Sequence, residues 1–329
     1  MHMKIGVTGA SGHVGNVVCR KLIEQGHDVR ALYNKDKRAL EDVDVELFQG
    51  NVLDAGRMKE FVDGCDVVIN LAAIISIYGD PTGIVFKTNT EGPRNVLNAC
   101  IEKGVKKIVH ASSTHAVLEE PLNEPFAETR PYKQPKHFAY DYSKATGEQI
   151  MLDAFKGGKI EGCVVRPSCV IGPYDFKPSE MGKAIKDFYN RKIPMLPPGG
   201  YNCVDVRDVA DSIIRAIDHG ENGEIYLLAG KYYSIKELAN VIHNVSGVKI
   251  PKSVTPFWLL KFSLPFVKAY GKMTKAAPLF TIEAITALKL GHPGMDWSKA
   301  EKSLQHKYTP LDKTIGDYLD WQKKQGVIK

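Results

Sequence analysis

A glycine-rich segment near the start of the chain limits the possible folds more than any other feature. The segment 8–15, TGASGHVG, follows the apolar run 4–7 and opens a predicted helix over 14–25 that Gly26 ends. At a strand-to-helix turn, glycines three residues apart let the backbone approach a pyrophosphate, which N–H groups at the helix start then bind. The alternative is a tight turn whose glycines serve packing only. The residues predicted to bind the pyrophosphate are Gly9, Ser11, Gly12, His13, Val14 and Gly15.

The first half of the chain alternates short apolar runs with amphipathic stretches. Strands are predicted over 4–7, 29–33, 45–49, 67–71, 107–111 and 162–166, and helices over 14–25, 89–103 and 140–155. The runs lack polar alternation, which is typical of strands buried on both faces of a parallel sheet. The pattern predicts an α/β protein with a Rossmann-type doubly wound parallel sheet. We expect this dinucleotide-binding domain over 1–172 and about 201–229, and a smaller, interleaved substrate lobe over 173–200 and 230–329.

Composition excludes several other classes of protein. The chain has 329 residues and a net charge of +6, and its basic residues form no stripe that would fit a nucleic acid. Its six cysteines stand singly, which favours free thiols in a reducing compartment, and no histidine or cysteine spacing indicates a metal site. No signal segment or apolar run long enough to span a bilayer is found. We therefore expect a cytoplasmic protein without an integral membrane segment.

The end of the second predicted strand bears on the choice between NAD and NADP. An acidic side chain at this point binds the ribose of NAD, whereas here Asn34 and Lys35 follow the strand. Lys35 and Arg38 could pair with a 2′-phosphate, so NADP is predicted. Asp36 keeps NAD possible.

Two side chains four residues apart on a predicted helix indicate acid–base chemistry. Tyr140 and Lys144 project from one helix face, and a nearby ammonium is expected to lower the pKa of the phenol. Tyr140 could then donate a proton to a carbonyl oxygen or remove one from an alcohol. Ser113, at the carboxyl end of a predicted strand, could hydrogen-bond the reacting oxygen. Tyr142 lacks a lysine four residues on and is the poorer candidate.

These motifs, in this order, resemble the extended short-chain dehydrogenase/reductase superfamily over nearly the whole chain. The matches are T-G-x-x-G-x-x-G at 8–15, G-N-x-x-D at 50–54, L-A-A at 71–73, N-x-x-G at 89–92, the serine at 113, Y-x-x-S-K at 140–144 and R-P-x-x-V-x-G-P at 166–173. The resemblance implies that Ser113, Tyr140 and Lys144 are catalytic, with Asn89 as a possible fourth member of a proton relay. It also implies a homodimer through helices that include the Tyr140 segment. Further cofactor contacts implied are Asn51, which replaces the family's usual aspartate, Val52, Leu71, Ala72, Ala73, Pro167, Ser168 and Val170.

Within that superfamily, the segment 199–210 resembles the dihydroflavonol-reductase-like and 3β-hydroxysteroid-dehydrogenase-like branch. Residues 201–203 lack the basic side chain that nucleotide-sugar epimerases usually carry there. The resemblance implies an oxidoreductase that interconverts a carbonyl and a hydroxyl on a small to medium, mainly apolar substrate. One alternative is a nucleotide-sugar epimerase or dehydratase with tightly bound NAD. Another is a binding protein that senses the cofactor without turnover.

Two further segments have open interpretations. The apolar stretch 256–267 could be a lid over the substrate, a helix lying on a membrane surface, or core of the small lobe. Four glutamates, at 119, 120, 124 and 128, lie in a proline-containing loop before the Tyr140 helix. We expect them to form a solvated rim near the substrate.

Overall fold

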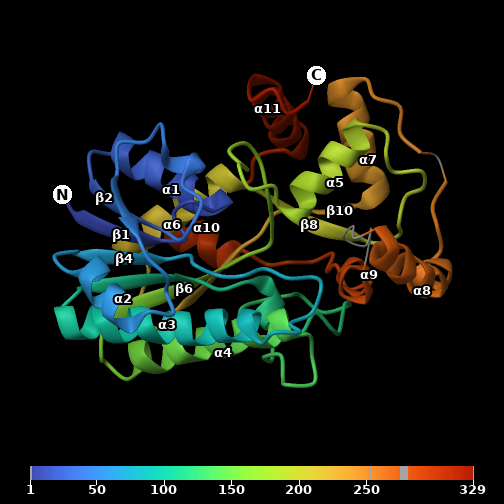
Figure 1. Cartoon of the computed structure of the whole chain (residues 1–329). Coiled ribbons are helices and arrows are strands. Elements are labelled where there is room, and N and C mark those ends of the chain that lie inside the picture. The colour runs from blue at the N-terminus through green and yellow to red at the C-terminus, as the bar shows by residue number, and fades with distance from the viewer. Residues whose placement is uncertain (1, 252, 275–280, 329) are drawn as a thin grey trace.

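A seven-stranded parallel sheet forms the centre of the molecule (Figure 1). The computed structural model describes residues 2–251, 253–274 and 281–328, with the backbone alone for 266–274. The strand order is β3-β2-β1-β4-β5-β6-β9, which confirms the predicted doubly wound α/β fold. The strands are β1 (Lys4–Thr8), β2 (Asp28–Tyr33), β3 (Glu46–Gln49), β4 (Val67–Asn70), β5 (Lys107–Ala111), β6 (Glu161–Pro167) and β9 (Ile225–Leu228).

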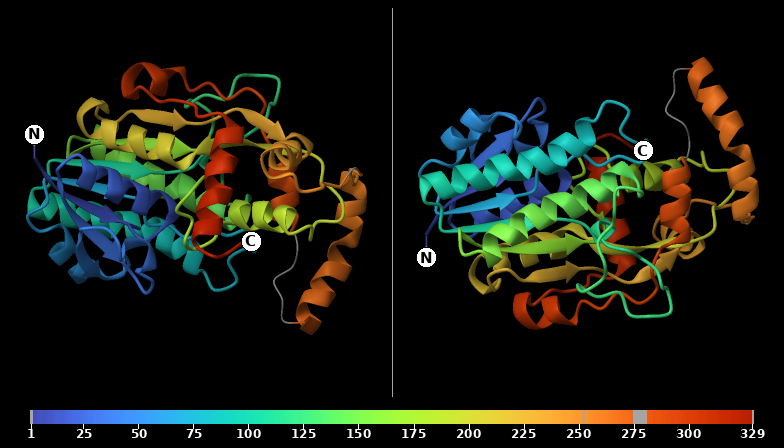
Figure 2. Two further views of the ribbon diagram at one scale, coloured as in Figure 1. Left: turned by 90° about the horizontal axis from the view of Figure 1, so that it is seen from above. Right: turned by 90° about the horizontal axis from the view of Figure 1, so that it is seen from below.

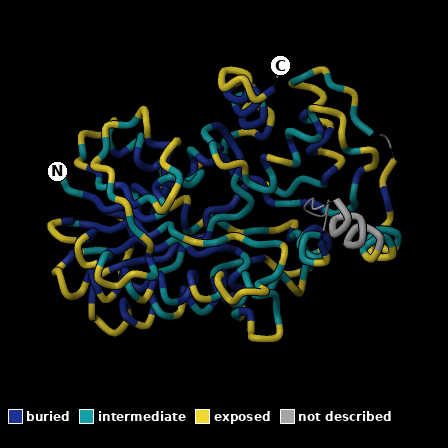
Figure 3. Tube along the Cα trace, in the orientation of Figure 1, coloured by how far each residue is buried: buried dark blue, intermediate teal, exposed yellow. Residues whose placement is uncertain are grey.

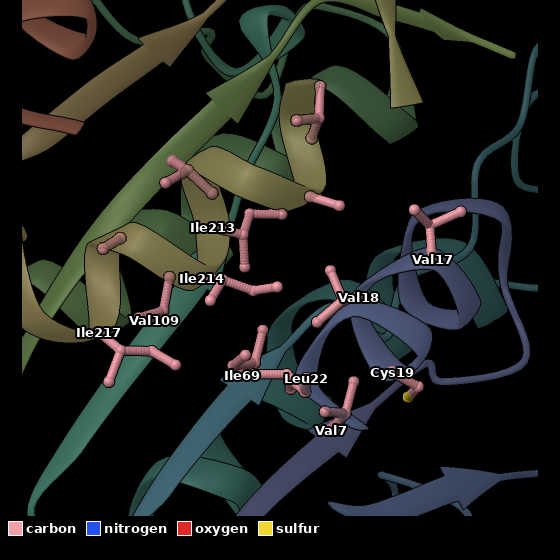
Figure 4. Packing of buried hydrophobic residues seen from close by; sticks show 14 of the residues in the cluster. Val7, Val17, Val18, Cys19, Leu22, Ile69, Val109, Ile213, Ile214 and Ile217 are labelled. Carbon is pink, nitrogen blue, oxygen red and sulfur yellow. The ribbon is translucent and has the colours of Figure 1, made fainter. Parts of the chain in front are cut away.

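Helices cover both faces of this sheet, as the apolar strands require. One face carries α1 (His13–Glu24), α6 (Val206–His219) and α10 (Ser298–Leu304), and the other carries α2 (Ala55–Val62), α3 (Ile84–Lys103) and α4 (Ala139–Lys156). Figure 4 shows Val18 of α1 and Ile213 of α6 lying over Ile69 of β4, all fully buried. This packing fixes the start of α1, and with it the glycine turn, against the sheet.

The small lobe is built around a second, three-stranded sheet. Its order is β10-β8-β7, with β7 (Cys169–Ile171) parallel and β10 (Tyr232–Ser234) antiparallel to β8 (Gly200–Asp205). Three helices pack their apolar faces on it, namely α5 (Glu180–Tyr189), α7 (Ile235–Ser246) and α11 (Leu311–Lys324). The remaining elements are α8 (Phe257–Thr274), α9 (Ile282–Lys289) and two short 3-10 turns, η1 (Arg38–Leu40) and η2 (Thr114–Ala116).

The two parts of the molecule are interleaved along the chain. After β8, α6 and β9 return to the large sheet, and α10 packs there through Ala300 and Leu304 although it falls within the predicted substrate lobe. Arg207 at the start of α6 pairs with Asp205 at 2.6 Å and with Asp317 of α11 at 2.6 Å. These ion pairs connect the start of α6, where the chain returns to the large sheet, with α11 of the small lobe. The predicted domain boundaries themselves stay a prediction.

The apolar segment 256–267 forms the start of α8, which stands away from the two sheets in both views of Figure 2. Phe257 packs against the core of the small lobe. Trp258 and Phe262 are 68% and 66% exposed, so the core interpretation is wrong for these two side chains. Figure 3 shows buried residues gathered along the strands of the large sheet and exposed ones on the outer loops and helices. The side chains of 266 and 267 lie outside the described residues. None of the helices in the described ranges is long and apolar enough to cross a membrane.

All six cysteines are free thiols, as their single placement along the chain predicted. Five are buried and Cys169 is half-buried.

Candidate active site

The glycine turn is shaped by contacts that leave no room for side chains. Gly9 has φ +66°, and a Cβ there would lie 2.8 Å from the backbone nitrogen of Ala72. A Cβ on Gly15 would lie 2.2 Å from the carbonyl oxygen of Gly9. Gly12 precedes α1 with extended backbone. The turn thus presents bare backbone at a helix N-terminus, which fits the pyrophosphate of a dinucleotide.

A line of polar side chains holds the neighbouring strand ends together. The Thr8 hydroxyl donates to Asn70 Oδ1 at 2.6 Å and accepts from the N–H groups of Leu71 and Ala72, each at 3.1 Å. Asn70 Nδ2 is 3.0 Å from His110 Nδ1. These bonds fix the carboxyl ends of β1, β4 and β5, where ligands bind in folds of this kind. No spacing rule links residues 40 to 64 positions apart, so sequence reasoning missed this network.

The other turn residues predicted to bind the pyrophosphate are His13, whose side chain bonds to another loop, and the half-buried Ser11 and Val14. The His13 imidazole is 3.1 Å from the carbonyl oxygen of Gly172 and 3.0 Å from that of Pro173. It therefore fastens the turn to the loop after β7 instead of pointing at a phosphate, and its backbone N–H is the group left for the cofactor.

The predicted adenosine end lies after β2, where Asn34, Lys35 and Arg38 are exposed. Arg38 Nη2 pairs with Asp36 Oδ2 at 2.6 Å. The hydrogen bonds from Arg38 lower the pKa of Asp36 to about 2. Asp36 and Arg38 thus neutralise one another, and the exposed cations Lys35 and Lys37 have no ion-pair partner among the described residues.

Further predicted cofactor residues line the next two strand ends. The Asn51 side chain accepts from Leu53 N–H at 3.0 Å, and Val52 is buried against Gly92, where a Cβ would approach it to 2.8 Å. Leu71 and Ala72 are half-buried and Ala73 is exposed, beside the glycine turn.

Ser113 and Tyr140 come together, as the sequence predicted. Ser113 precedes η2, and its hydroxyl accepts from His115 N–H at 3.2 Å. Tyr140 lies in the first turn of α4 and is half-buried. Burial raises the pKa of Tyr140 to about 12, and the interaction with the Ser113 side chain acts in the opposite direction. The expectation that the neighbouring ammonium lowers this pKa is therefore wrong for the structure described, because desolvation of the phenolate dominates.

Lys144 lies one turn along α4 and is buried. Its ammonium donates to the carbonyl oxygen of Ala111 at the end of β5, with an Nζ–O distance of 2.8 Å. Burial lowers the pKa of Lys144 to about 8, and the Glu148 carboxylate offsets part of that shift. The Lys144 side chain is thus shielded from water, near the carboxyl end of β5 and the start of α4.

Asn89 takes a different position from the one implied by the proton relay. Its side chain accepts from Ile74 N–H at 2.8 Å, and its Nδ2 donates to the Ile74 carbonyl and to Ser143 Oγ, each at 2.9 Å. Ser143 in turn donates to the Tyr140 carbonyl at 2.6 Å. In this arrangement Asn89 holds the loop after β4 against α4, and Ser143 links it to the backbone carbonyl of Tyr140.

The residues predicted to face the nicotinamide follow β6. Pro167, Ser168 and Val170 are half-buried, and Ser168 accepts from Gly230 N–H at 3.4 Å. This bond joins the loop after β6 to the loop after β9.

A buried ion-pair cluster beside Tyr140 was not predicted. His115 Nδ1 is 3.2 Å from Asp141, and Lys133 pairs with both Asp141 and Glu119. Burial of the imidazole opposes its charging, but the hydrogen bond to Asp141 prevails and the pKa of His115 is raised. His115, Glu119 and Asp141 could converge on a metal ion, yet the Lys133 ammonium already contacts both carboxylates.

Glu119 is therefore part of this cluster, not of the solvated rim expected for the glutamates. Glu128 also departs from the rim, since it accepts from Leu227 N–H of β9. Glu120 and Glu124 are exposed as expected.

Because the Lys144 ammonium is buried, the free energy of unfolding is expected to change with pH in the alkaline range. The pKa of Lys144 is about 8 in the fold, whereas the usual pKa of a lysine is 10.5. Between these values the unfolded chain binds the proton more strongly, so stability rises with pH. We expect wild type to gain about 2 kcal/mol relative to Lys144→Met between about pH 7 and pH 9.5, measured by urea unfolding. If wild type and Lys144→Met differed in free energy of unfolding by the same amount at both pH values, burial would not disfavour the charged form of Lys144.

Comparisons with known proteins agree with this geometry. The model of the NAD dependent epimerase/dehydratase family matches residues 5–229. "Sterol demethylase protein B" of Methylococcus capsulatus is 28% identical over 98% of this chain and 99% of its own. A "putative dihydroflavonol 4-reductase" of Synechocystis is 30% identical over 98% of this chain and 95% of its own. The crystal structure of gox2253 superposes with a TM-score of 0.86 at 28% identity, covering 100% of both chains.

Proposed function

Because the chain belongs to the NAD-dependent epimerase/dehydratase family, and is an enzyme of the extended short-chain dehydrogenase/reductase type, we propose that it interconverts a carbonyl and a hydroxyl group. The observation that carries the proposal is the buried ammonium of Lys144, one helical turn from Tyr140, which donates to the Ala111 carbonyl at the strand end that Ser113 follows. All three lie at the carboxyl end of the sheet that carries the glycine turn.

A nicotinamide dinucleotide, when bound at the glycine turn, supplies or accepts the hydride. Tyr140 Oη donates the proton to the carbonyl oxygen in reduction and removes it from the hydroxyl in oxidation. Ser113 Oγ orients the reacting oxygen through a hydrogen bond. The Lys144 ammonium would offer donors to a ribose hydroxyl, since only one of its donors is taken by Ala111.

A small to medium, mainly apolar substrate fits this chain better than a nucleotide sugar. In β8, Asn202 and Cys203 are buried and Tyr201 is half-buried, so no cation stands where a diphosphate would need one. The relatives whose names contain sterol and dihydroflavonol support the same class of substrate.

The test is a screen of aldehydes, ketones and sterol-like alcohols with NADPH and NADH, followed by nicotinamide absorbance. Stoichiometric cofactor consumption supports the proposal. Turnover of a nucleotide sugar without net consumption would instead establish the epimerase alternative. Tight NADPH binding with no turnover throughout the screen would favour a cofactor-sensing protein.

We propose NADP as the preferred cofactor because Lys35 is the first exposed cation after β2 while Asp36 is neutralised by Arg38. Lys35→Ser is expected to weaken NADPH binding about tenfold, the cost of one charged hydrogen bond. NADH binding serves as the internal control and should stay unchanged, with both affinities measured by fluorescence titration. Equal weakening of both cofactors, or none, would contradict the assignment of Lys35 to the 2′-phosphate.

A further inference from the structure

The exposed aromatic side chains of α8 need an explanation that the proposed reaction does not supply. Trp258 and Phe262 are 68% and 66% exposed, whereas large apolar side chains elsewhere in the described chain mostly lie in cores. They are four residues apart, and Pro265 three residues further on is also exposed, so all three share one helix face. Phe257 fastens the start of α8 to the small lobe by packing into its core.

A second group of exposed apolar side chains lies at the neighbouring helix. α8 contacts α9, where Ile282 is 40% exposed. The Thr281 hydroxyl before α9 donates to the Ile77 carbonyl at 2.5 Å and so fixes the loop after β4, in which Ile75 is 72% exposed. The apolar surface therefore extends from α8 through α9 to a loop that begins at the predicted cofactor site.

The stretch 238–282, which contains α8 and ends at the first residue of α9, carries only positive charge, and Glu283 of α9 is the acidic residue that follows it. Residues 238–282 contain six lysines, at 249, 252, 261, 268, 272 and 275, and no arginine, aspartate or glutamate. The net charge of the whole chain is +6, so the rest of the sequence is neutral overall. Lys249 and Lys261 are exposed among the described side chains. A second copy packed symmetrically on α8 would face its own positive charge, whereas an anionic surface would be attracted.

We propose that α8 and the adjoining apolar surface dock on an anionic phospholipid bilayer. Trp258 and Phe262 would enter the headgroup boundary, where aromatic residues are enriched, while the exposed Lys261 of the same helix contacts lipid phosphates. The helix lies on the membrane and does not cross it, consistent with the absence of a spanning helix in the described ranges. This interaction goes beyond the proposed reaction and does not depend on it.

The experiment is cosedimentation of the full chain with vesicles of phosphatidylcholine, with and without about 30% phosphatidylserine. We expect binding to the anionic vesicles, a weaker signal with neutral ones, and loss of binding at high salt. The Trp258 emission should shift to the blue on binding, since Trp258 is the most exposed of the three tryptophans. The substitutions Trp258→Ser and Phe262→Ser together should lower the partition coefficient more than about tenfold.

The matched control replaces two exposed apolar residues away from α8, Leu47→Ser with Ile101→Ser, which are 41% and 39% exposed. This variant should bind vesicles like wild type, and both variants should keep the wild-type thermal midpoint. The proposal is overturned if anionic vesicles bind no protein, or bind the α8 variant as well as wild type. Dimerisation that the α8 variant abolishes, without vesicle binding, would assign the surface to a second copy. An α8 variant that binds vesicles normally but loses only turnover would show a lid.

Discussion

Tyr140→Phe is expected to lower kcat about 10³-fold while cofactor affinity stays within about twofold of wild type. The substitution removes only the phenolic oxygen, whose pKa the Ser113 side chain lowers. Its ring lies 6.0 Å from His115 and keeps that packing as phenylalanine. Because the phenol is the group we assign to proton transfer, its loss leaves the substrate and cofactor contacts in place but removes the acid–base step. Steady-state kinetics on any substrate from the screen, together with NADPH titration, measures the two quantities separately.

Tyr142→Phe is the control on the same helix. The Tyr142 ring stacks on Phe86 with 5.3 Å between ring centroids, and the residue four positions on is Thr146. This variant should keep kcat within about threefold of wild type, since its hydroxyl has no part in acid–base chemistry. If Tyr140→Phe retained a near-normal rate, or if Tyr142→Phe lost as much, the assignment of the proton donor would be wrong.

The alternation of apolar runs and helices was enough to predict the large sheet, because a strand buried on both faces cannot be polar. Helix α2 was missed: it has only eight residues, and Asp54, which caps it, was assigned to a family motif. The position of α10 could not be predicted either. Ala300 and Leu304 are two small apolar residues far from α6 in sequence, and nothing local shows that they pack on it.

In the candidate site too, features set by local sequence could be predicted, whereas features set by long-range contacts could not. Tyr140 and Lys144 could be paired from helix periodicity, and Ser113 from its place at a strand end. The pKa of Tyr140 could not be predicted from that pairing, because burial depends on the whole fold and outweighs a single neighbour. The bond of His13 to the loop after β7 likewise joins positions 159 residues apart. Local spacing therefore found the reactive groups but not their environment.

Gly15→Ala is expected to destabilise the fold by about 2 kcal/mol and to weaken NADPH binding more than tenfold. The new methyl group would lie 2.2 Å from the Gly9 oxygen and 2.8 Å from Ala10 Cα. Both are backbone atoms of the turn itself, so relief of the clash must move α1 away from the surface that is proposed to hold the pyrophosphate. Urea unfolding measures the stability, and titration of NADPH fluorescence measures the affinity.

Gly316→Ala is the matched control, since Gly316 also lies within a helix, α11, and a Cβ there has no atom within 4 Å. Because alanine has fewer conformations than glycine in the unfolded chain, this substitution should raise the free energy of unfolding by about 0.5–1 kcal/mol. The NADPH affinity should stay unchanged. Gly15→Ala should lower the free energy of unfolding and Gly316→Ala should raise it. This difference in sign distinguishes the clash inside the turn from a general effect of replacing a glycine in a helix. A Gly15→Ala protein that is destabilised yet binds NADPH as tightly as wild type would mean that the turn serves packing alone. In that case the cofactor would have to be held elsewhere.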